Sequence, residues 1–356
     1  MSLHDEIHEQ PDVARRFLAQ HLAAVEALAD GLADRPIDLI LIAARGTSDH
    51  AAIYAQYVFG GLHRLPVALA APSLVSLYGI APRLDRALVL GISQSGRSPD
   101  VVAVLRAARA QGAHTVAITN APGSSLAKAA EFSIDIDAGP ERATAATKTY
   151  TGQLLAVAAL AAALPPQAGG ARTLGGSTKE RCAALAAVPE ALAAALAVDA
   201  DAARLAADRK SLDRCTVLGR AFDYATAREW ALKLKELAQV HAESYSTADF
   251  QHGPLALVEP GYPVLAVAPS GIAGGDLAVL IGRLRDEHQV DALIVSDDPA
   301  IRAVGNASLS LPAGLPEWLM PIVSIVPGQL FALHLTVARG FDPERPRWIS
   351  KVTETR

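Results

Sequence analysis

The sequence repeats itself at a distance of 175 residues, and this repeat restricts the chain to folds with two similar halves. The stretch "IDLILIAARGTSDHAAIYAQYVFGGL" reads as strand, turn and helix, and "RCTVLGRAFDYATAREWALKLKELA" follows the same order. Arg45 and Arg220 are 175 residues apart, as are Ser95 and Ser270, and "TVAITNAPG" and "ALIVSDDPA" nearly keep this offset. These units predict an α/β fold with two parallel sheets, each flanked by helices.

The domain boundaries follow from this repeat and from local composition. We expect an N-terminal helical segment over 1–35 and a first domain over 36–164. The Pro- and Gly-rich stretch "PPQAGGARTLGGST" at 165–178 is typical of a linker. A second domain with its preceding helix is expected over 179–340, followed by a C-terminal tail over 341–356.

Composition excludes several classes of partner. The chain has 356 residues, of which 51% are hydrophobic and 19% charged, with a net charge of −5. This balance predicts a globular protein and argues against a nucleic-acid or membrane-surface partner. Cys182 and Cys215 lack metal-ligand spacing and suit a reducing compartment. The longest apolar run, near Leu154 to Leu164, is shorter than the about 20 residues of a membrane span. We therefore expect a cytoplasmic protein without a membrane partner.

Two hydroxyl-rich turns predict an anion site. Each follows an apolar strand and precedes a helix, so that hydroxyls and backbone N–H groups at a helix N-terminus can surround a phosphate. The candidate phosphate ligands are Thr47 and Ser48 in "RGTSDH" and Ser93, Gln94, Ser95 and Ser98 in "SQSGRS". The alternative is that these residues only form turns and helix caps, but two such loops at successive strand ends favour binding.

A nucleotide-binding loop is a second interpretation of the same stretch. Gly91, Gly96, Arg97 and Ser98 fit the pattern G-x-x-x-x-G-[KR]-S, with arginine at the lysine position. That motif requires the compact lysine charge and an acidic strand for a metal ion, and neither is evident. No G-x-G-x-x-G pattern supports a dinucleotide. A phosphate ester on a small molecule is therefore the favoured ligand.

The segment "ALKLKELAQVHAESYSTADFQHGP" carries the candidate acid–base chemistry. Lys233 and Glu236 are three residues apart on a predicted helix and share one face, a spacing that by itself is typical of a solvated surface pair. The helix is followed by what reads as a polar loop with two histidines. His241 alone would suit a helix C-terminus, whereas His252 precedes a Gly-Pro pair and is expected to be held in place.

These motifs resemble the SIS (sugar isomerase) domain family over nearly the whole chain. The resemblance rests on "RGTSDHAA", "SQSGRSPD", "ATAATKTY", "ALKLKE…HAE…HGPLAL" and "RPRWISKVTETR", and on "EIHEQPDVARRFL" near the start. It is strongest to the isomerase half of glucosamine-6-phosphate synthase and to SIS-type glucosamine-6-phosphate deaminases. It implies two flavodoxin-like subdomains, each a three-layer αβα sandwich.

The resemblance also implies how a sugar phosphate is bound. The hydroxyl loops would hold the 6-phosphate. The backbone of Ala145 and Ala146 would approach the sugar, although the synthase has a serine where Ala146 stands.

The catalytic roles are implied in the same way. Glu236 would move the proton between C1 and C2, with Lys233 near the C2 oxygen. Lys351 would close over the open-chain sugar and reach its carbonyl to form an imine. His252 would assist ring opening, in the site of the neighbouring subunit of a homodimer.

The reaction expected is deamination of glucosamine 6-phosphate to fructose 6-phosphate and ammonia. The chain begins Met1-Ser2-Leu3 without the cysteine of a glutaminase domain, so we expect no use of glutamine by this chain alone. The motifs "ARGTSDH", "GRSP" and "AATK" resemble the deaminase branch. The alternatives are an isomerase or deglycase for another amino-sugar phosphate, an ammonia-dependent synthase subunit served by a separate glutaminase, and a non-catalytic sugar-phosphate sensor.

We expect neither cofactor nor metal, because the ten histidines are scattered and no carboxylate–histidine cluster has ligand spacing. The sensor is disfavoured because Glu236, His252 and Lys351 are all present, whereas a sensor needs only the serine loops.

Overall fold

The computed structural model describes residues 2–33, 35–165 and 174–351. The chain divides into two compact units. We call residues 12–141, 148–186 and 350–356 the first unit, and residues 1–11, 142–147 and 187–349 the second unit. The division differs from the sequence boundaries: residues 179–186 belong to the first unit, residues 142–147 to the second unit, and the N-terminal helical segment is divided between the two at residue 12. Residues 166–173 of the predicted linker lie outside the described residues.

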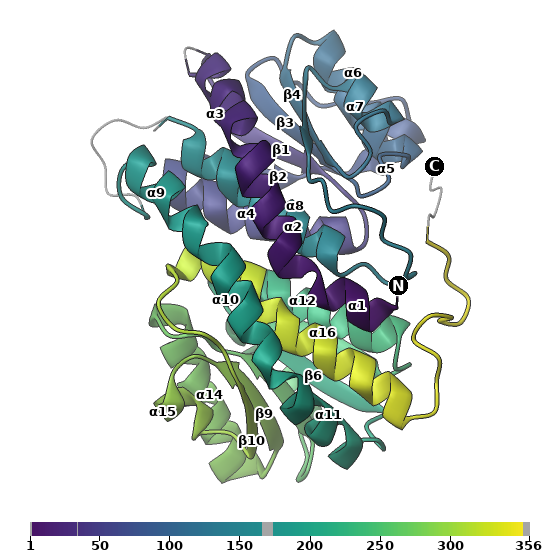
Figure 1. The fold of residues 1–356 in the computed structure, drawn as a ribbon, viewed down its shortest axis with the longest axis vertical. Coiled ribbons are helices and arrows are strands. Elements are labelled where there is room, and N and C mark those ends of the chain that lie inside the picture. The colour runs from purple at the N-terminus through teal and green to yellow at the C-terminus, as the bar shows by residue number, and fades with distance from the viewer. Residues whose placement is uncertain (1, 34, 166–173, 352–356) are drawn as a thin grey trace. The chain divides into compact units, whose positions relative to one another are not determined.

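The first unit contains a five-stranded parallel sheet in the order β2-β1-β3-β4-β5 (Figure 1). Its strands are β1 (Leu39–Ala43), β2 (Val67–Leu69), β3 (Ala87–Ile92), β4 (His114–Thr119) and β5 (Phe132–Asp135). The central strand β3, "ALVLGI", is buried along its whole length, as expected for a parallel strand covered by helices on both faces.

The second unit repeats this sheet. Its order is β10-β9-β8-β6-β7, which read from the other edge is the same order as in the first unit. The strands are β6 (Arg214–Gly219), β7 (His241–Ser246), β8 (Pro263–Val267), β9 (Asp291–Ser296) and β10 (Ala307–Ser310). This order is that of flavodoxin-like sheets. The predicted fold class, two similar parallel sheets flanked by helices, is confirmed.

Helices connect the strands throughout. In chain order the described helices are α1 (Leu3–His8), α2 (Gln10–Gln20), α3 (Leu22–Gly31), α4 (Thr47–His63), α5 (Pro72–Ser76), α6 (Pro99–Ala110), α7 (Ser125–Ala129), α8 (Lys148–Ala163), α9 (Thr178–Ala184), η1 (Leu185–Ala187), α10 (Val188–Ala195), η2 (Leu196–Val198), α11 (Asp199–Asp208), η3 (Ala221–Asp223), α12 (Tyr224–Glu236), α13 (Thr247–Gln251), η4 (Pro254–Leu257), α14 (Ile272–His288), α15 (Pro299–Arg302), η5 (Glu317–Leu319) and α16 (Met320–Ala338).

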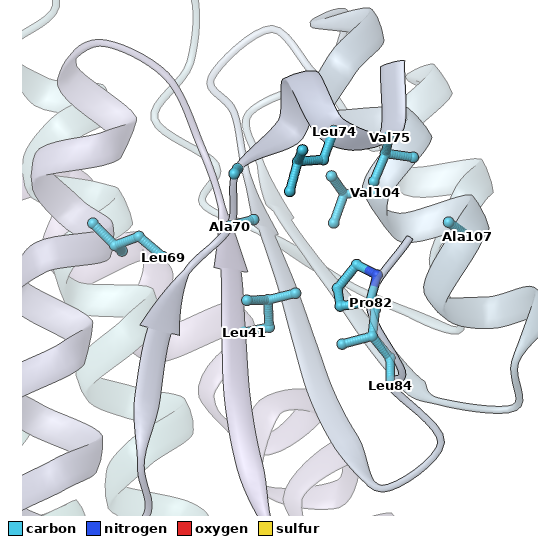
Figure 2. A pocket seen from close by; sticks show the side chains of 10 residues that line it. Leu41, Leu69, Ala70, Leu74, Val75, Pro82, Leu84, Val104 and Ala107 are labelled. Carbon is cyan, nitrogen blue, oxygen red and sulfur yellow. The ribbon is translucent and has the colours of Figure 1, made fainter. Parts of the chain in front are cut away.

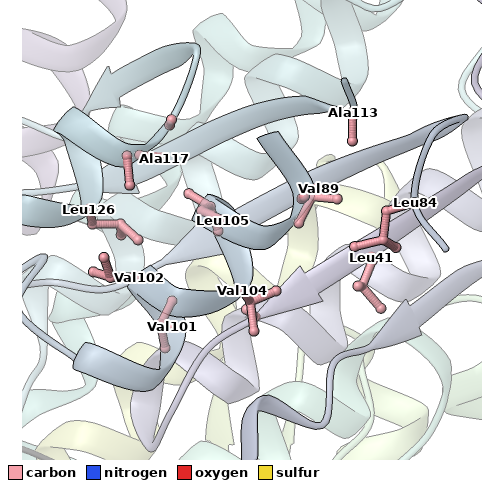
Figure 3. Packing of buried hydrophobic residues seen from close by; sticks show 14 of the residues in the cluster. Leu41, Leu84, Val89, Val101, Val102, Val104, Leu105, Ala113, Ala117 and Leu126 are labelled. Atoms are coloured by element: carbon pink, nitrogen blue, oxygen red, sulfur yellow. The ribbon is translucent and has the colours of Figure 1, made fainter. Parts of the chain in front are cut away.

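One face of the first sheet is sealed by α6. Val101, Val104 and Leu105 on this helix are buried, and they pack with Val89 of β3 and Leu41 of β1 (Figure 3). Because apolar residues recur on one side of α6 at helical spacing, the helix lies with that side on the sheet. The helix begins at Pro99, after the loop 93–98 that follows β3.

The helix α16 is the core helix of the second unit. It lies alongside α10 and α11 (Figure 1). Thr178–Asp208 and Glu317–Ala338 are long and apolar enough to cross a membrane, which corrects the sequence estimate that no apolar stretch reaches that length. The most apolar part of Glu317–Ala338 is 89% buried inside the protein, as in the core helix of a globular domain. Its length and composition are therefore only weak evidence for a membrane span.

The polar segment after α12 is more regular than its sequence predicted. Residues 241–246 form the edge strand β7, and 247–251 form α13, so the prediction of a polar loop was wrong there. His241 starts a strand and does not end a helix. The strand is polar because it has only one neighbour, β6, and lies at the edge of the sheet.

Candidate active site

The two hydroxyl-rich loops lie side by side in the first unit. They follow β1 and β3, which are paired in parallel with Ala43 opposite Gly91. Between these strands the sheet order reverses, and such a switch point is where parallel α/β sheets bind ligands. The predicted phosphate ligands of both loops therefore meet at the carboxyl edge of one sheet.

The loop after β3 turns its hydroxyls toward its own backbone. Ser93 Oγ lies 3.4 Å from Ser98 Oγ and accepts a 3.2 Å hydrogen bond from the Gly96 N–H. Ser95 Oγ accepts one of 3.3 Å from the Arg97 N–H. Gln94 is half-buried beside them. The loop is a compact cluster of hydroxyls rather than an extended connection.

Gly96 makes this shape possible. Its φ is +61°, and a Cβ there would lie 2.0 Å from Ser124 Oγ. An L-residue is disfavoured at this φ, and the side-chain hydroxyl leaves no room for one. Any other residue here would therefore be strained and would have to displace Ser124.

Both loops run directly into helix N-termini. Ser98 is the N-cap of the 12-residue α6, yet its side chain makes no capping hydrogen bond, and its hydroxyl lies 3.4 Å from that of Ser93. Thr47 begins the 17-residue α4, after Gly46 with φ +56°. The helix dipole favours an anion at such an end. The Val101 N–H of α6 already donates to Asp100 Oδ1 at 2.9 Å, and the Ser48 and Asp49 N–H groups of α4 donate to backbone oxygens.

Gln153 and Asp100, which the sequence analysis did not single out, hold the first loop. Gln153 of α8 donates a 3.0 Å hydrogen bond to the buried Ser48 Oγ. Arg45 Nε donates across 2.7 Å to the carboxylate of Asp100, which is fully buried in the first turn of α6. The Arg45–Asp100 pair thus links the two loops. Neither contact has a local sequence signal, since 105 residues separate Ser48 from Gln153 and 55 separate Arg45 from Asp100.

Lys351 is anchored in the first unit. Its Nζ lies 2.6 Å from Glu141 Oε2. Glu141 is fully buried and also accepts hydrogen bonds from the Thr149 N–H and hydroxyl, at 3.1 and 2.8 Å. A buried carboxylate needs such partners because desolvation is costly. Glu141 was not singled out from the sequence.

Ala145 and Ala146 belong to the second unit. Ala145 is buried and Ala146 half-buried, in the stretch between β5 and α8. The start of this stretch is held by Glu6 of α1, whose fully buried carboxylate accepts hydrogen bonds from the backbone N–H groups of Arg142 and Ala143. Glu6 is a further residue that the sequence analysis missed.

Lys233 and Glu236 form a buried ionic group with Glu229. Lys233 is 1% exposed and donates to Glu236, and its Nζ lies 3.3 Å from the fully buried Glu229. Burial opposes the Lys233 charge, but Glu229 and Glu236 outweigh it, and they raise the pKa of Lys233 above its ordinary value. The pair is therefore not a solvated surface contact. The signal for Glu229 was its i,i+4 spacing from Lys233.

Glu236 keeps access to solvent. Its side chain is 22% exposed, in contrast to that of Glu229, and it is the last residue of α12. The dipole of a helix disfavours a negative charge at this end, and the Lys233 ammonium compensates for it. A carboxylate so placed can exchange a proton with a bound molecule while its orientation is fixed by the lysine.

His252 stands apart from the other candidates. It caps α13 next to Gly253, whose φ is +144°, and its side chain is exposed. Its imidazole makes no hydrogen bond to any described residue. Of the predicted residues, the second unit thus holds Ala145, Ala146, Lys233, Glu236 and His252, and the first unit holds the phosphate ligands and Lys351.

A separate cavity of about 180 Å³ lies in the first unit, and it is apolar (Figure 2). Its lining is aliphatic and shares no residue with the hydroxyl loops; it comprises Leu41, Leu69, Ala70, Ala71, Leu74, Val75, Pro82, Leu84, Val104 and Ala107. Such walls offer no hydrogen-bond donor side chain to a phosphate. The cavity is therefore not part of the anion site.

The expectation that the histidines are scattered was wrong at one place. His4, His8 and Asp199 lie close enough in the second unit to hold a metal ion, and His334 contacts the same carboxylate. The sequence signal was the i,i+4 spacing of His4 and His8, which puts both rings on one face of α1.

Residues 36–163 and 210–339 match the model of the SIS domain. The chain belongs to the SIS domain family. Among curated relatives, glutamine–fructose-6-phosphate aminotransferase [isomerizing] of Pyrococcus horikoshii is 34% identical over 349 residues, 97% of this chain and 56% of that enzyme. The chain thus spans little more than half the length of this relative.

Solved structures agree with this assignment. A protein from Silicibacter pomeroyi DSS-3, proposed to be a phosphosugar isomerase, is 35% identical with a TM-score of 0.82, covering 96% of this chain and 99% of that one. Glucosamine-6-phosphate deaminase of Thermotoga maritima covers 100% of both chains with a TM-score of 0.72, at 22% identity. The second likeness is one of fold.

Proposed function

We propose that this chain is a sugar-phosphate enzyme that moves a proton between C1 and C2 of an open-chain amino sugar, and that it deaminates glucosamine 6-phosphate. The observation that carries the proposal is the solvent-accessible Glu236 carboxylate fixed by the buried Lys233. The cluster of hydroxyls at two helix N-termini supports a phosphate monoester as the group recognised.

The proposed reaction consumes one water. Glu236 removes the proton from C2 of the ring-opened aldehyde and returns it to C1. The C2 amino group loses one proton and the C1 oxygen gains one, so that C1 becomes a hydroxymethyl group and C2 an imine. Water adds to C2, ammonia leaves, and fructose 6-phosphate remains. Lys233 would stabilise charge near C2, and its raised pKa keeps it cationic at neutral pH. His252 would move the ring-opening proton.

Lys351 would close over the open-chain sugar in this scheme. The ion pair with Glu141 supports a defined resting position for this lysine. An imine with the sugar carbonyl would require Lys351 to leave Glu141 and lose its proton, with release of water. Ala145 and Ala146 would contact the sugar through their backbone.

The second candidate function is the same chemistry in reverse, in which the chain aminates fructose 6-phosphate with free ammonia. The identity of 34% to the Pyrococcus aminotransferase favours it. Deamination is preferred because "ARGTSDH", "GRSP" and "AATK" resemble the deaminase branch. Both candidates place the proton transfer on Glu236.

The test is an assay of the purified chain with glucosamine 6-phosphate, following fructose 6-phosphate and ammonia separately. We expect equal release of both products, and a rate about 10²- to 10⁴-fold lower in Glu236→Gln. Ser98→Ala should instead weaken substrate binding by about ten- to a hundredfold, because it removes a hydrogen bond to a charged group.

Three results would change the assignment. Formation of glucosamine 6-phosphate from fructose 6-phosphate and ammonia, without detectable deamination, would favour the synthase subunit. Turnover of another amino-sugar phosphate alone would keep the mechanism and change the substrate. Binding of sugar phosphates without any turnover would overturn the enzyme in favour of a sensor.

We further propose a cytoplasmic homodimer in which His252 enters the neighbouring subunit's site. The exposed imidazole supports this, since it has no partner among the described residues of its own chain. Mixed dimers of Glu236→Gln and His252→Ala chains test it. If His252 crosses, an equal mixture recovers about a quarter of wild-type activity, because half the dimers then contain one complete site. Recovery of none, with dimers formed, would place His252 in its own subunit's site.

A further inference from the structure

The second unit contains a cluster of three imidazoles around one carboxylate. His4 and His8 are on α1, Asp199 is the first residue of α11, and His334 is on α16. His4 Nε2 lies 2.8 Å and His8 Nε2 3.4 Å from the same oxygen, Asp199 Oδ2, while His334 Nε2 lies 2.5 Å from Oδ1. The proposed reaction uses none of these residues.

The spacing of the three ligand atoms fits a transition-metal ion. One atom from each of His4, His8 and Asp199 lies within 4.8 Å of the others. Ligand atoms at about 2.0–2.1 Å from a tetrahedral ion are about 3.4 Å apart, so only sub-ångström shifts would be needed. The side chains are between 26% and 44% exposed, which lets an ion enter from solvent.

The hydrogen bond of His8 identifies which nitrogen is left for an ion. His8 Nδ1 lies 3.0 Å from the backbone oxygen of His4, an acceptor, so the Nδ1–H donates there. Nε2 is therefore the nitrogen of His8 that is turned toward Asp199 Oδ2, at 3.4 Å. A ligating histidine typically donates its other ring N–H to a carbonyl oxygen in this way.

His334 orients the carboxylate. By donating to Oδ1 it leaves Oδ2 directed toward His4 and His8. A histidine–carboxylate contact of this kind, behind a ligating oxygen, is typical of metal sites.

We propose that His4, His8 and Asp199 bind a divalent transition-metal cation of the zinc type, with His334 as a positioning residue and solvent in the remaining coordination position. Two imidazoles and one carboxylate are ligands that such ions prefer. The ion fastens α1 to α11, within the second unit. The inference is independent of the proposed reaction.

The ion would act on the stretch that contains Ala145 and Ala146. Glu6 lies between the two histidines on α1, and its buried carboxylate holds the N–H groups of Arg142 and Ala143. Fixing α1 therefore also fixes this backbone, which lies next to the proposed sugar contacts.

The test is titration of the chelator-treated full-length chain with Zn²⁺, by calorimetry and by competition with a chromophoric chelator. We expect one ion per chain with micromolar affinity or tighter. His8→Ala and Asp199→Asn should each weaken binding by at least about tenfold, and His334→Gln, which keeps a donor, by less. Co²⁺ should give the visible absorption of a tetrahedral or five-coordinate site in the wild type and lose it in His8→Ala.

The matched control is His21→Ala. His21 Nε2 also lies 3.4 Å from a carboxylate, that of Asp137, but without a second histidine, so its loss should leave Zn²⁺ binding unchanged. Circular dichroism of each variant checks folding. No Zn²⁺ binding at micromolar concentration, or equal binding by wild type, His8→Ala and Asp199→Asn, would overturn the site. Slower amide exchange at residues 142–143 with Zn²⁺ is expected, and unchanged exchange would overturn the coupling to that stretch.

Discussion

The two sheets have the same strand order, but their switch points differ in charge. After β1 and β3 the chain presents hydroxyls and helix N-termini. In the second unit, carboxylates from other segments face the loop after β8: the Ser270 N–H and hydroxyl both donate to Asp297, which follows β9, at 2.6 and 2.5 Å, and Gly271 faces Glu317 of η5. In the second unit the chain's own carboxylates thus take the hydrogen-bond donors that a phosphate would need. The repeated backbone provides a position for a ligand in each unit, and the side chains around that position determine which ligand charge it can bind.

Each switch point has an equivalent arginine–aspartate ion pair. Arg45 contacts Asp100 in the first unit, and Arg220, 175 residues later, contacts Asp276 at 3.3 Å. In each case the arginine follows one strand, β1 or β6, and the aspartate lies near the start of the helix that follows the neighbouring strand of the sheet, β3 or β8. The pair therefore belongs to the repeated framework and does not distinguish the anion site.

The largest contrast in ligand binding is expected between two glycines. Gly96→Ala must relieve a 2.0 Å contact with Ser124 Oγ at a φ of +61°, so we expect loss of the loop shape and at least a hundredfold weaker binding of sugar phosphate, or about 3 kcal/mol. Gly271→Ala, at φ +130°, meets only the flexible Glu317 side chain at 3.0 Å. It should lower the melting temperature and leave binding unchanged. Calorimetric titration of both variants with a sugar phosphate measures the two affinities. Equal losses of binding would contradict the assignment of the anion site to the first unit alone.

Asp223 makes the stability of the second unit fall as pH rises toward neutrality. Burial, opposed by hydrogen bonds from Ser324 and Thr226, raises the pKa of Asp223 from 3.8 to about 7. Between these values the folded chain holds a proton that the unfolded chain has lost, so this contribution to stability is lost as pH rises from about 4 to about 7. It amounts to about 4 kcal/mol. Asp223→Asn should flatten the fall in melting temperature over this range. An unchanged slope would show that Asp223 is not the group.

His63 gives the first unit the opposite response. Burial lowers the pKa of His63 from 6.5 to about 4, with its Nε2 2.7 Å from the Ala161 carbonyl oxygen. On acidification from pH 6.5 to about 4 the unfolded chain takes up a proton that the folded chain excludes, so stability falls by up to about 3 kcal/mol. Amide exchange measured separately in the two units should show the first weakening with acid. His63→Gln, which keeps the donor, should remove that dependence.

The smallest contrast is expected between the two aspartates of the repeated ion pair. Asp100 is fully buried, whereas Asp276 is 53% exposed. Asp100→Asn removes a buried charge partner and should cost about 1–3 kcal/mol. Asp276→Asn should cost less than about 1 kcal/mol, because an exposed pair is screened by solvent. Urea unfolding of the two variants measures both, and the reverse order would contradict the burial argument.

The fold was predictable because its evidence is local and repeated. Apolar strands, glycine turns and helical periodicity recur at one offset, and each hydroxyl loop is a continuous stretch of sequence. The contacts that complete the sites are not local: Lys351 meets Glu141 across 210 residues, and Glu6 meets Arg142 across 136. No periodicity signals such pairs, because they depend on how helices and sheets pack. The edge strand β7 was missed for a related reason, since its polarity reflects its place in the sheet rather than its conformation.

The tail that leads to Lys351 has an optical consequence. Of the three tryptophans, Trp230 and Trp318 are buried, while Trp348, three residues before Lys351, is 94% exposed. Its indole should therefore emit at longer wavelength than the other two and be open to quenching by iodide. In a Trp348→Phe chain this red component should vanish, so the wild-type spectrum contains a natural reporter on the segment that carries the lysine, without any attached dye.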